Sequence, residues 1–475
     1  MNPFVDIHCH PTFKAYGHSF PGMKHNPNIR KKDSIFYYDP PGAFEKLIDL
    51  LGGIVKYRQS DMSSLGFGNT GVICASLYPL ERAFFDNNFG TNDFNDMLLN
   101  FITSVSKNRI DFVQGVTDYF ADLKNEYEYY KAMHDQPVTL ADNSQYKYVL
   151  AKNSADVEVI VNSDGSPDKK ANTIAVVLSI EGGHAFGTGI DPAHNRAKPE
   201  TVLSNVNEVK NWEFRPLFIT LTHHFYNEIC GHARSLTGIV SKATDQSFGL
   251  GTGFTKMGKD VVKALLDNSS GKRIYIDIKH MSRQSRLEYF NMLDTDFISE
   301  DIPVIVSHGA VVGNDEDKEL FLSEDINIFD DEIVRIGKTN GLFGLQLDER
   351  RITAPDSSNL KKSHSLERRK VLYYSSYLVW KQIQHIAELL DAEGMFAWGI
   401  QSIGSDFDGV VNPINGYWTA ENFPTLEDYL LKHAFNYMNT DGKSLKQARN
   451  KIDPEEIVSR MMGTNAYQFI LKYFK

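Results

Sequence analysis

Two histidines close the first apolar run of the chain, FVDIHCH at residues 4–10. His8 and His10 are two residues apart, so on a β-strand both side chains point to the same side. Two imidazoles on one side can bind a single metal ion. The pair could equally be two surface polar residues, or two core histidines that hydrogen-bond to the backbone, so the motif by itself does not decide between these interpretations.

Polar residues also follow other apolar runs of the chain. They are Glu181 in SIEGGH, His223 and His224 in ITLTHH, His280 in IDIKHM, His308 in VIVSHG, and Asp406 and Asp408 in IGSDFDG. One histidine after a strand is weak evidence for a metal, because such residues are usually capped or hydrogen-bonded. In a barrel of parallel strands, however, all these ends converge at one mouth. So many buried imidazoles and carboxylates need compensating partners, and divalent metal would satisfy them together.

The residue types indicate which metal would bind and what it would do. Imidazole with carboxylate suits zinc or a neighbouring first-row ion better than magnesium or calcium. We expect two divalent ions, each held by a histidine pair and both bridged by one glutamate: His8 with His10, His280 with His308, and Glu181. Two ions that share a water lower its pKa and supply hydroxide at neutral pH. Asp406 would then act as the general base and proton shuttle.

The apolar runs that precede these residues define the elements that must position them. We predict eight strands at about 4–10, 71–78, 174–181, 215–223, 273–281, 303–308, 341–348 and 398–406. Helical patterns lie between them, as in 366–391, where apolar residues recur at helical spacing. This alternation predicts an α/β fold, a (β/α)8 TIM-like barrel with insertions and with its chemistry at the carboxyl ends of the strands. An open nucleotide-binding sheet is disfavoured, because no phosphate-binding glycine motif follows the first strand.

We expect one hydrolase domain over residues 1–475, with an insertion at 80–173, because that gap is too long for a single crossover. Within it, 94–106 and 123–134 are predicted to be helices, and 147–172 a hairpin with a polar turn. The aromatic run EYEYYKAMH at 126–134 could form a binding surface. Packing against the barrel or a neighbouring subunit is the simpler interpretation.

Composition narrows the class of protein. A net charge of −11 with 23% charged residues is typical of a soluble globular protein and gives no broad basic surface for nucleic acid. No apolar stretch approaches the roughly 20 residues of a membrane helix, and three dispersed cysteines predict no disulfide framework. We therefore expect a cytoplasmic protein with a small-molecule substrate and without a nucleic-acid or membrane partner, and we leave a homodimer open.

The motifs, in this order, resemble those of the membrane (renal) dipeptidase family of the amidohydrolase superfamily, whose members are binuclear zinc (β/α)8 enzymes. The resemblance rests on VDIHCH, EGGH, ITLTH, IDIKHMS, PVIVSHGA and IGSDFDGV. It implies the same metal ligands and the same role for Asp406. It also implies that His223 stabilises the oxyanion of a tetrahedral intermediate, and it gives His224 no counterpart.

Two departures from the family pattern bear on the substrate. The first motif of the family is typically His-x-Asp, whereas this chain has His8 and His10, as in the wider superfamily, which makes the site one unit more positive. The family also binds the terminal carboxylate of its substrate with an arginine after the sixth-strand histidine, and SEDINIFDDEIVR at 323–335 has none at that position. Substitutes could come from other loops: Arg196, Arg234, Arg350 or Arg351.

The leading hypothesis is a binuclear zinc hydrolase of a dipeptide-like amide bond. One alternative is an amidohydrolase for another carbonyl or phosphoryl substrate, such as a lactone, a cyclic amide or an ester, and the unmatched arginine favours it somewhat. Another is a catalytically silent, metal-stabilised barrel that binds a ligand. Asp406 argues against this last hypothesis, because a binding protein needs no proton shuttle.

Overall fold

The computed structural model describes residues 3–86, 90–140, 142–163, 172–236, 238–313 and 319–475. Eight parallel strands close into a barrel in the order β1-β2-β5-β6-β7-β8-β9-β10, with β10 paired back to β1. This confirms the predicted (β/α)8 barrel. The strands are β1 (Phe4–Cys9), β2 (Thr70–Leu77), β5 (Thr173–Glu181), β6 (Phe218–Thr220), β7 (Tyr275–Asp277), β8 (Ile305–Gly309), β9 (Leu342–Leu345) and β10 (Gln401–Ile403).

The barrel strands are continuous apolar runs because both of their faces are covered. Every residue of β1 and β2 is buried. Several strands end earlier than predicted, among them β6 at Thr220, β7 at Asp277 and β10 at Ile403. The predicted runs continue past these points as loops, which carry His223, His280 and Asp406 beyond the sheet to the mouth of the barrel.

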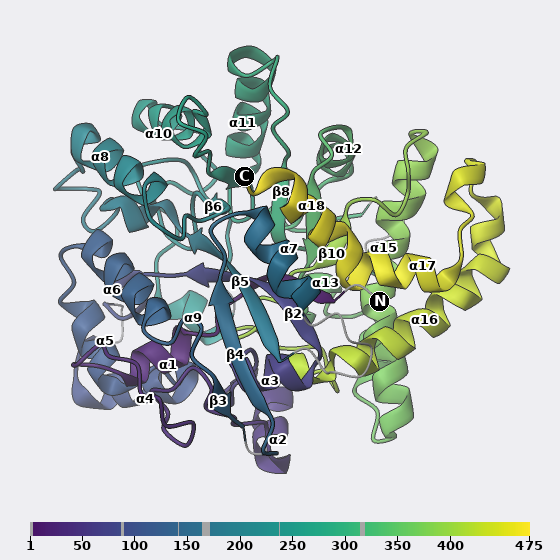
Figure 1. Cartoon of the computed structure of the whole chain (residues 1–475), viewed down its shortest axis with the longest axis horizontal. Coiled ribbons are helices and arrows are strands. Elements are labelled where there is room, and N and C mark those ends of the chain that lie inside the picture. Colours follow the sequence, from purple (N-terminus) through teal and green to yellow (C-terminus); the bar gives the residue numbers. More distant parts are fainter. Residues whose placement is uncertain (1–2, 87–89, 141, 164–171, 237, 314–318) are drawn as a thin grey trace.

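Helices cover the outside of the barrel (Figure 1). In α10, for example, the buried residues Val261, Val262, Leu265 and Leu266 form one apolar stripe. The helices outside the segment between β2 and β5 are α1 (Phe13–His18), α2 (Ala43–Gly52), α3 (Met62–Phe67), α8 (Pro199–Lys210), α9 (Gly238–Ala243), α10 (Lys256–Leu266), α11 (Arg283–Asp296), α12 (Asp330–Lys338), α13 (Glu349–Ile352), α14 (Ser358–Ser363), α15 (Arg368–Ala392), α16 (Phe423–Asn439), α17 (Pro454–Ser459) and α18 (Asn465–Tyr473). Short 3-10 or π turns are η1 (Arg82–Phe84), η2 (Gly183–Phe186), η4 (Ala420–Asn422), η5 (Asp441–Ser444), η6 (Ala448–Asn450) and η7 (Arg460–Thr464). Helix α15 matches the prediction for 366–391.

The segment between β2 and β5 adds helices beside the barrel. Its elements after η1 are α4 (Asp93–Thr103), α5 (Lys107–Gln114), α6 (Tyr119–Lys131), β3 (Val138–Thr139), β4 (Gln145–Leu150) and α7 (Ser154–Ser163). Helices α4, α5 and α6 gather next to α1 (Figure 1), and α4 and α6 lie where helices were predicted. Tyr127, Tyr129 and Tyr130 of the aromatic run are buried, which agrees with packing rather than with a surface for a partner.

The hairpin predicted at 147–172 is wrong. Strand β4 pairs in parallel with β5 and antiparallel with β3, and residues 154–163 form α7. The β-branched run there is helical, because Val157 and Ile160 are buried at helical spacing while Val159 is 67% exposed. Residues 164–171 of the predicted hairpin lie outside the described residues.

Among the described residues, each helix is too short or too polar to span a bilayer.

Candidate metal centre

Six buried side chains meet at the carboxyl ends of five strands. His8 belongs to β1 and His10 follows it, Glu181 ends β5, His280 follows β7, His308 belongs to β8, and Asp406 follows β10. Glu181 is central: its Oε1 lies 3.5–3.7 Å from the Nε2 atoms of His8, His280 and His308. Its Oε2 lies 3.1 Å from Nε2 of His10. The structure therefore brings together every residue that the sequence proposed as a ligand, with the proposed proton shuttle beside them.

The four histidines form two pairs whose geometry fits metal. Nε2 of His8 lies 3.1 Å from Nε2 of His10, and the same atoms of His280 and His308 are also 3.1 Å apart. Two nitrogens on one tetrahedral zinc would be about 3.3 Å apart, from a Zn–N distance of about 2.05 Å. Glu181 Oε1 is buried and has no hydrogen bond from the described residues, which is costly for a carboxylate oxygen. The donor set therefore suits divalent ions.

Burial and neighbouring charges favour the protonation states that metal requires. Burial lowers the pKa of His280 well below its usual value, and the charge of His223 lowers it further. Burial and the charge of His8 do the same to the pKa of His308. Burial would raise the pKa of Glu181, but His223 and His8 outweigh it and hold that pKa well below its usual value. Neutral imidazole and ionised carboxylate are the forms that coordinate metal.

His10 behaves differently. Burial opposes its charge, but hydrogen bonds with Asp406 and Glu181 outweigh that effect and raise the pKa of His10 to about 10. Without metal, this imidazole is therefore a cation beside the two carboxylates. Metal binding at this position must release its proton.

Asp406 lies at the edge of the cluster in a strained backbone conformation. Its Oδ1 is 3.6 Å from Nε2 of His8 and 3.5 Å from Nε2 of His10. Its Oδ2 accepts a hydrogen bond of 2.7 Å from Gln346 Nε2. Asp406 has φ 59° and His280 has φ 65°, in the left-handed region that costs non-glycine residues free energy. Both side chains are thus aimed at the centre by backbone that the surroundings hold in place.

Two aspartates within the strands orient the residues around them. Asp6 accepts hydrogen bonds from the backbone N–H groups of Ser405 (3.0 Å) and His8 (3.2 Å), which ties β1 to the loop after β10. Asp277 accepts one from Ser307 Oγ at 2.6 Å, and this hydroxyl lies 2.9 Å from Nδ1 of His308. Such contacts to the far nitrogen of an imidazole fix its orientation as a ligand.

His223 faces the centre as part of a chain of charged groups. Its Nδ1 donates a hydrogen bond of 2.8 Å to Glu81, and its Nε2 lies 3.7 Å from Glu181 Oε1. Burial opposes the charge on His223, but Glu181 and Glu81 outweigh it and raise its pKa. Glu81 also accepts hydrogen bonds from Tyr78 Oη and the Phe225 N–H. The stretch LYPLER at residues 77–82 gives no sequence signal that Glu81 belongs to the site, because its partner His223 is more than a hundred residues away.

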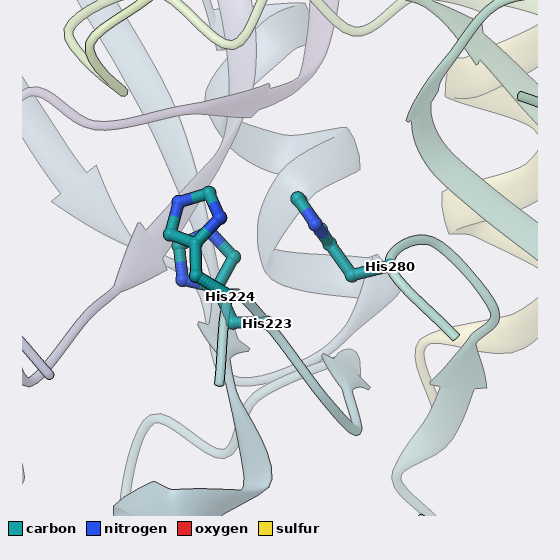
Figure 2. Close-up of side chains that lie close together, drawn as sticks. All are labelled: His223, His224 and His280. Carbon is teal, nitrogen blue, oxygen red and sulfur yellow. The ribbon is translucent and has the colours of Figure 1, made fainter. Parts of the chain in front are cut away.

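His224 lies in the same cluster. Figure 2 shows its ring beside that of His223, with His280 across from them. Nδ1 of His224 is 2.7 Å from Ser235 Oγ, and burial together with the charge of His223 lowers its pKa well below the usual value. Ligand atoms of His223, His224 and His280 lie within 4.8 Å of one another. The residue without a counterpart in the resembled family is therefore part of the site.

A cavity of about 130 Å³ opens over these side chains. Lys279 lines it; its Nζ donates a long hydrogen bond of 3.4 Å to Gln346, and burial, with the charge of Arg351, lowers its pKa to about 7. Arg351 also lines it and is 7% exposed. Its Nη2 donates to the Ser235 carbonyl, its Nη1 has no hydrogen bond among the described residues, and its ion pair with Glu324 spans 3.9 Å.

Of the four arginines proposed as substitutes, Arg350 and Arg351 line the cavity. Arg350 is already paired with Asp348 at 2.6 Å. Lys279 and Gln346 are further lining residues that the sequence did not single out, since a lysine and a glutamine near strand ends carry no signal by themselves.

The remaining polar residues of the motifs have structural partners. Asp408 accepts hydrogen bonds from the backbone N–H groups of Gln59 and Ser60 and pairs with Lys14 at 3.1 Å, which anchors the segment before α3. Cys9 is fully buried in the main apolar core, as expected for a packing residue.

Comparison with known proteins gives the family. No curated protein matches the chain. The probable dipeptidase PvdM from Pseudomonas aeruginosa is 12% identical with a TM-score of 0.53, covering 98% of this chain and 94% of that one. The structure titled dipeptidase AC, a metallo peptidase, is 13% identical with a TM-score of 0.53, covering 100% and 98%. A metallo peptidase from Rhodobacter sphaeroides, liganded with a phosphinate mimic of the dipeptide L-Ala-D-Ala, is 13% identical with a TM-score of 0.50, covering 100% and 99%.

At these identities the solved structures support the fold alone, and the family rests on sequence. A model described as membrane dipeptidase (Peptidase family M19) matches residues 99–446, which begin after His8 and His10. Ligand roles at those two positions therefore rest on geometry. Because the match spans well over half of the chain, the protein belongs to the membrane dipeptidase family, Peptidase family M19, and is a metal-dependent hydrolase.

Proposed function

We propose that the protein is a binuclear metal hydrolase that cleaves the amide bond of dipeptide-like substrates, with zinc as the ion that best suits its ligands. One observation carries the proposal: a single buried carboxylate, Glu181, lies between two histidine pairs, with Asp406 next to one of them. His8 with His10 would hold one ion, His280 with His308 the second, and Glu181 both.

The groups of the chain divide the proton chemistry between them. Divalent ions bound there supply Lewis-acid polarisation of the amide carbonyl and lower the pKa of water. Asp406, whose Oδ2 is held by Gln346, takes the proton of the attacking water through Oδ1 and returns it to the leaving amine. His223, kept protonated by Glu81 and Glu181, donates a hydrogen bond to the oxyanion as the carbonyl is attacked.

Lys279 and Arg351 would hold the terminal carboxylate of the substrate. Both side chains are more than nine-tenths buried at the cavity, and neither has a carboxylate partner at hydrogen-bonding distance among the described residues. Buried cations without such a partner are unfavourable, so an anionic ligand stabilises them. A solved structure with the same fold is liganded with a mimic of L-Ala-D-Ala, which is consistent with a substrate of this kind.

The test is hydrolysis of a dipeptide panel by the metal-loaded protein, with Asp406→Asn as the matched variant. The expected result is turnover by the native protein and none by Asp406→Asn, with equal metal content by mass spectrometry. If no dipeptide is cleaved while a lactone or an ester is, the alternative substrate class is correct. Normal hydrolysis by Asp406→Asn would exclude the proposed shuttle.

A further inference from the structure

The cavity over the metal centre has two unlike sides. Lys279 and Gln346 line it from the loops after β7 and β9, and Arg351 lines it from α13, which follows β9. Apolar lining residues include Phe84, Leu98, Leu99 and Ile102 from the segment after β2, and Leu236 and Val240 from the segment after β6. The cavity volume of about 130 Å³ corresponds to about ten water-sized sites, so it can admit a large side chain.

Helix α4, in the segment between β2 and β5, supplies Leu98, Leu99 and Ile102 to this apolar wall. Leu98 and Ile102 are four residues apart and share one face of the helix with Leu99. Met97, Asn100, Phe101 and Ser104 line a different cleft. Leu98 is 40% exposed although it faces the cavity, so apolar surface stays in contact with water when the cavity contains no ligand. Covering that surface with an apolar group is favourable.

The strand order places the loops after β7 and β9 across the barrel from the segment after β2. In the order β1-β2-β5-β6-β7-β8-β9-β10, the strands β7 and β9 flank β8, which lies half a turn from β2. The segment after β6 instead lies beside Arg351, whose Nη2 donates a hydrogen bond to the Ser235 carbonyl. In the sequence, α4 lies between β2 and β5, and its side chains Leu98, Leu99 and Ile102 line the cavity. A dipeptide whose carboxylate meets Lys279 and Arg351, with its amide bond at the metal centre, therefore extends its amino-terminal residue toward α4.

We infer that α4 makes this protein selective for dipeptide-like substrates with a bulky apolar side chain, aliphatic or aromatic, on the amino side of the cleaved bond. The inference rests on the proposed function and adds the substrate class to it. Leu98, Leu99 and Ile102 determine the specificity: they contact the substrate side chain and take no part in the proton chemistry.

The experiment compares Gly-Ala, Leu-Ala and Phe-Ala, which share one carboxyl-terminal residue, as substrates of the zinc-loaded full-length protein. We expect kcat/KM for Leu-Ala and Phe-Ala to exceed that for Gly-Ala by about tenfold or more, the scale of discrimination in apolar pockets. Leu98→Ser should lower that ratio by at least about threefold. Met97→Ser is the matched control, since Met97 is the preceding residue of the same helix, is 64% exposed and lines the other cleft.

Equal kcat/KM for Gly-Ala and Phe-Ala in the native protein would overturn the inference, as would equal effects of Leu98→Ser and Met97→Ser. Absence of hydrolysis with all three dipeptides would instead overturn the proposed function. In that case the apolar wall can still be tested by measuring, with calorimetry, how tightly the zinc-loaded Asp406→Asn variant binds Phe-Ala and Gly-Ala. If Phe-Ala binds more tightly than Gly-Ala to Asp406→Asn, and if this difference disappears when Leu98→Ser is added, the selectivity of the apolar wall is supported. Equal binding of the two dipeptides refutes it.

Discussion

Glu81 Oε2 accepts a hydrogen bond of 2.8 Å from Nδ1 of His223, and this contact joins the inserted segment to the metal centre. The bond fixes the proton on Nδ1 and turns Nε2 toward Glu181, 3.7 Å away. Glu81 is 4% exposed, so its charge acts on His223 with little screening by water. The orientation and the charge of the proposed oxyanion donor thus depend on a residue outside every motif that identified the site.

Replacing Glu81 tests this dependence. Glu81→Gln removes the charge that supports protonated His223, so kcat should fall by about tenfold to a hundredfold, as for other residues that orient site groups. Metal content should not change. Because Glu81 acts through His223, Glu81→Gln should have no further effect on kcat in a His223→Ala background. Effects that multiply would show that Glu81 acts independently of His223.

Arg351 is expected to recognise the substrate carboxylate. Arg351→Met should raise KM for Phe-Ala by about tenfold or more, because a charge-assisted hydrogen bond is lost, with a smaller effect on kcat. The amidated substrate Phe-Ala-NH2 provides the control, since it lacks the carboxylate. The native protein should cleave this amide poorly, and Arg351→Met should cleave it no more slowly than the native protein does. An equal penalty of the variant on both substrates would refute the assignment.

The insertion and the barrel are expected to unfold together. Arg109 of α5 forms a two-point ion pair with Asp122 of α6, at 2.8 and 2.6 Å, and Tyr16 of α1 donates a hydrogen bond of 2.9 Å to the same carboxylate. Arg109→Met leaves Asp122 buried without its cation, which should lower the free energy of unfolding by about 3–5 kcal/mol. Arg109→Met with Asp122→Leu should recover much of the loss. Calorimetry should show one transition that shifts as a whole, whereas two separate transitions would contradict a single domain.

His433 of α16 should make stability pH-dependent. Burial lowers its pKa to about 4, and Nε2 lies 2.9 Å from Ser376 Oγ. Below about pH 6.5 this imidazole is protonated in the unfolded chain, whereas in the folded chain it stays neutral until about pH 4. Stability therefore falls as the pH is lowered through this window. Between pH 7 and pH 5 the native protein should lose about 2 kcal/mol more than His433→Gln, as measured by denaturant unfolding. Parallel curves for the two proteins would contradict this.

Much of this site could be predicted from sequence because its ligands stand at the ends of strands. The apolar runs before Glu181 and His308 identify strands, and a parallel barrel brings such ends to one mouth whatever the loops between them do. Hydrophobic periodicity was less reliable in short β-branched stretches. Residues 154–163 form a helix in which Val157 and Ile160 are buried while Val159 is exposed, and a count of valines does not reveal that.

Three other site residues could not be predicted from sequence, because each depends on a distant contact. Glu81 matters through His223, Gln346 through Asp406, and Lys279 through the cavity that it lines. Arg351 could be named from sequence only as one of four candidate arginines, and its place at the cavity distinguishes it. The insertion is predicted from its length alone, and the apolar side that α4 presents to the cavity emerges only when the barrel is closed. The specificity that we propose would therefore be encoded by segments that carry no motif.

The metal dependence of Phe-Ala hydrolysis tests the proposed binuclear centre most directly. The protein is stripped with a chelator, its metal content is measured by mass spectrometry, and zinc is then titrated back while turnover is followed. We predict that activity disappears with the metal and is restored in full at two zinc ions per chain, and that Glu181→Gln recovers neither metal content nor turnover. Full hydrolysis by the metal-free protein, or by Glu181→Gln, would contradict it.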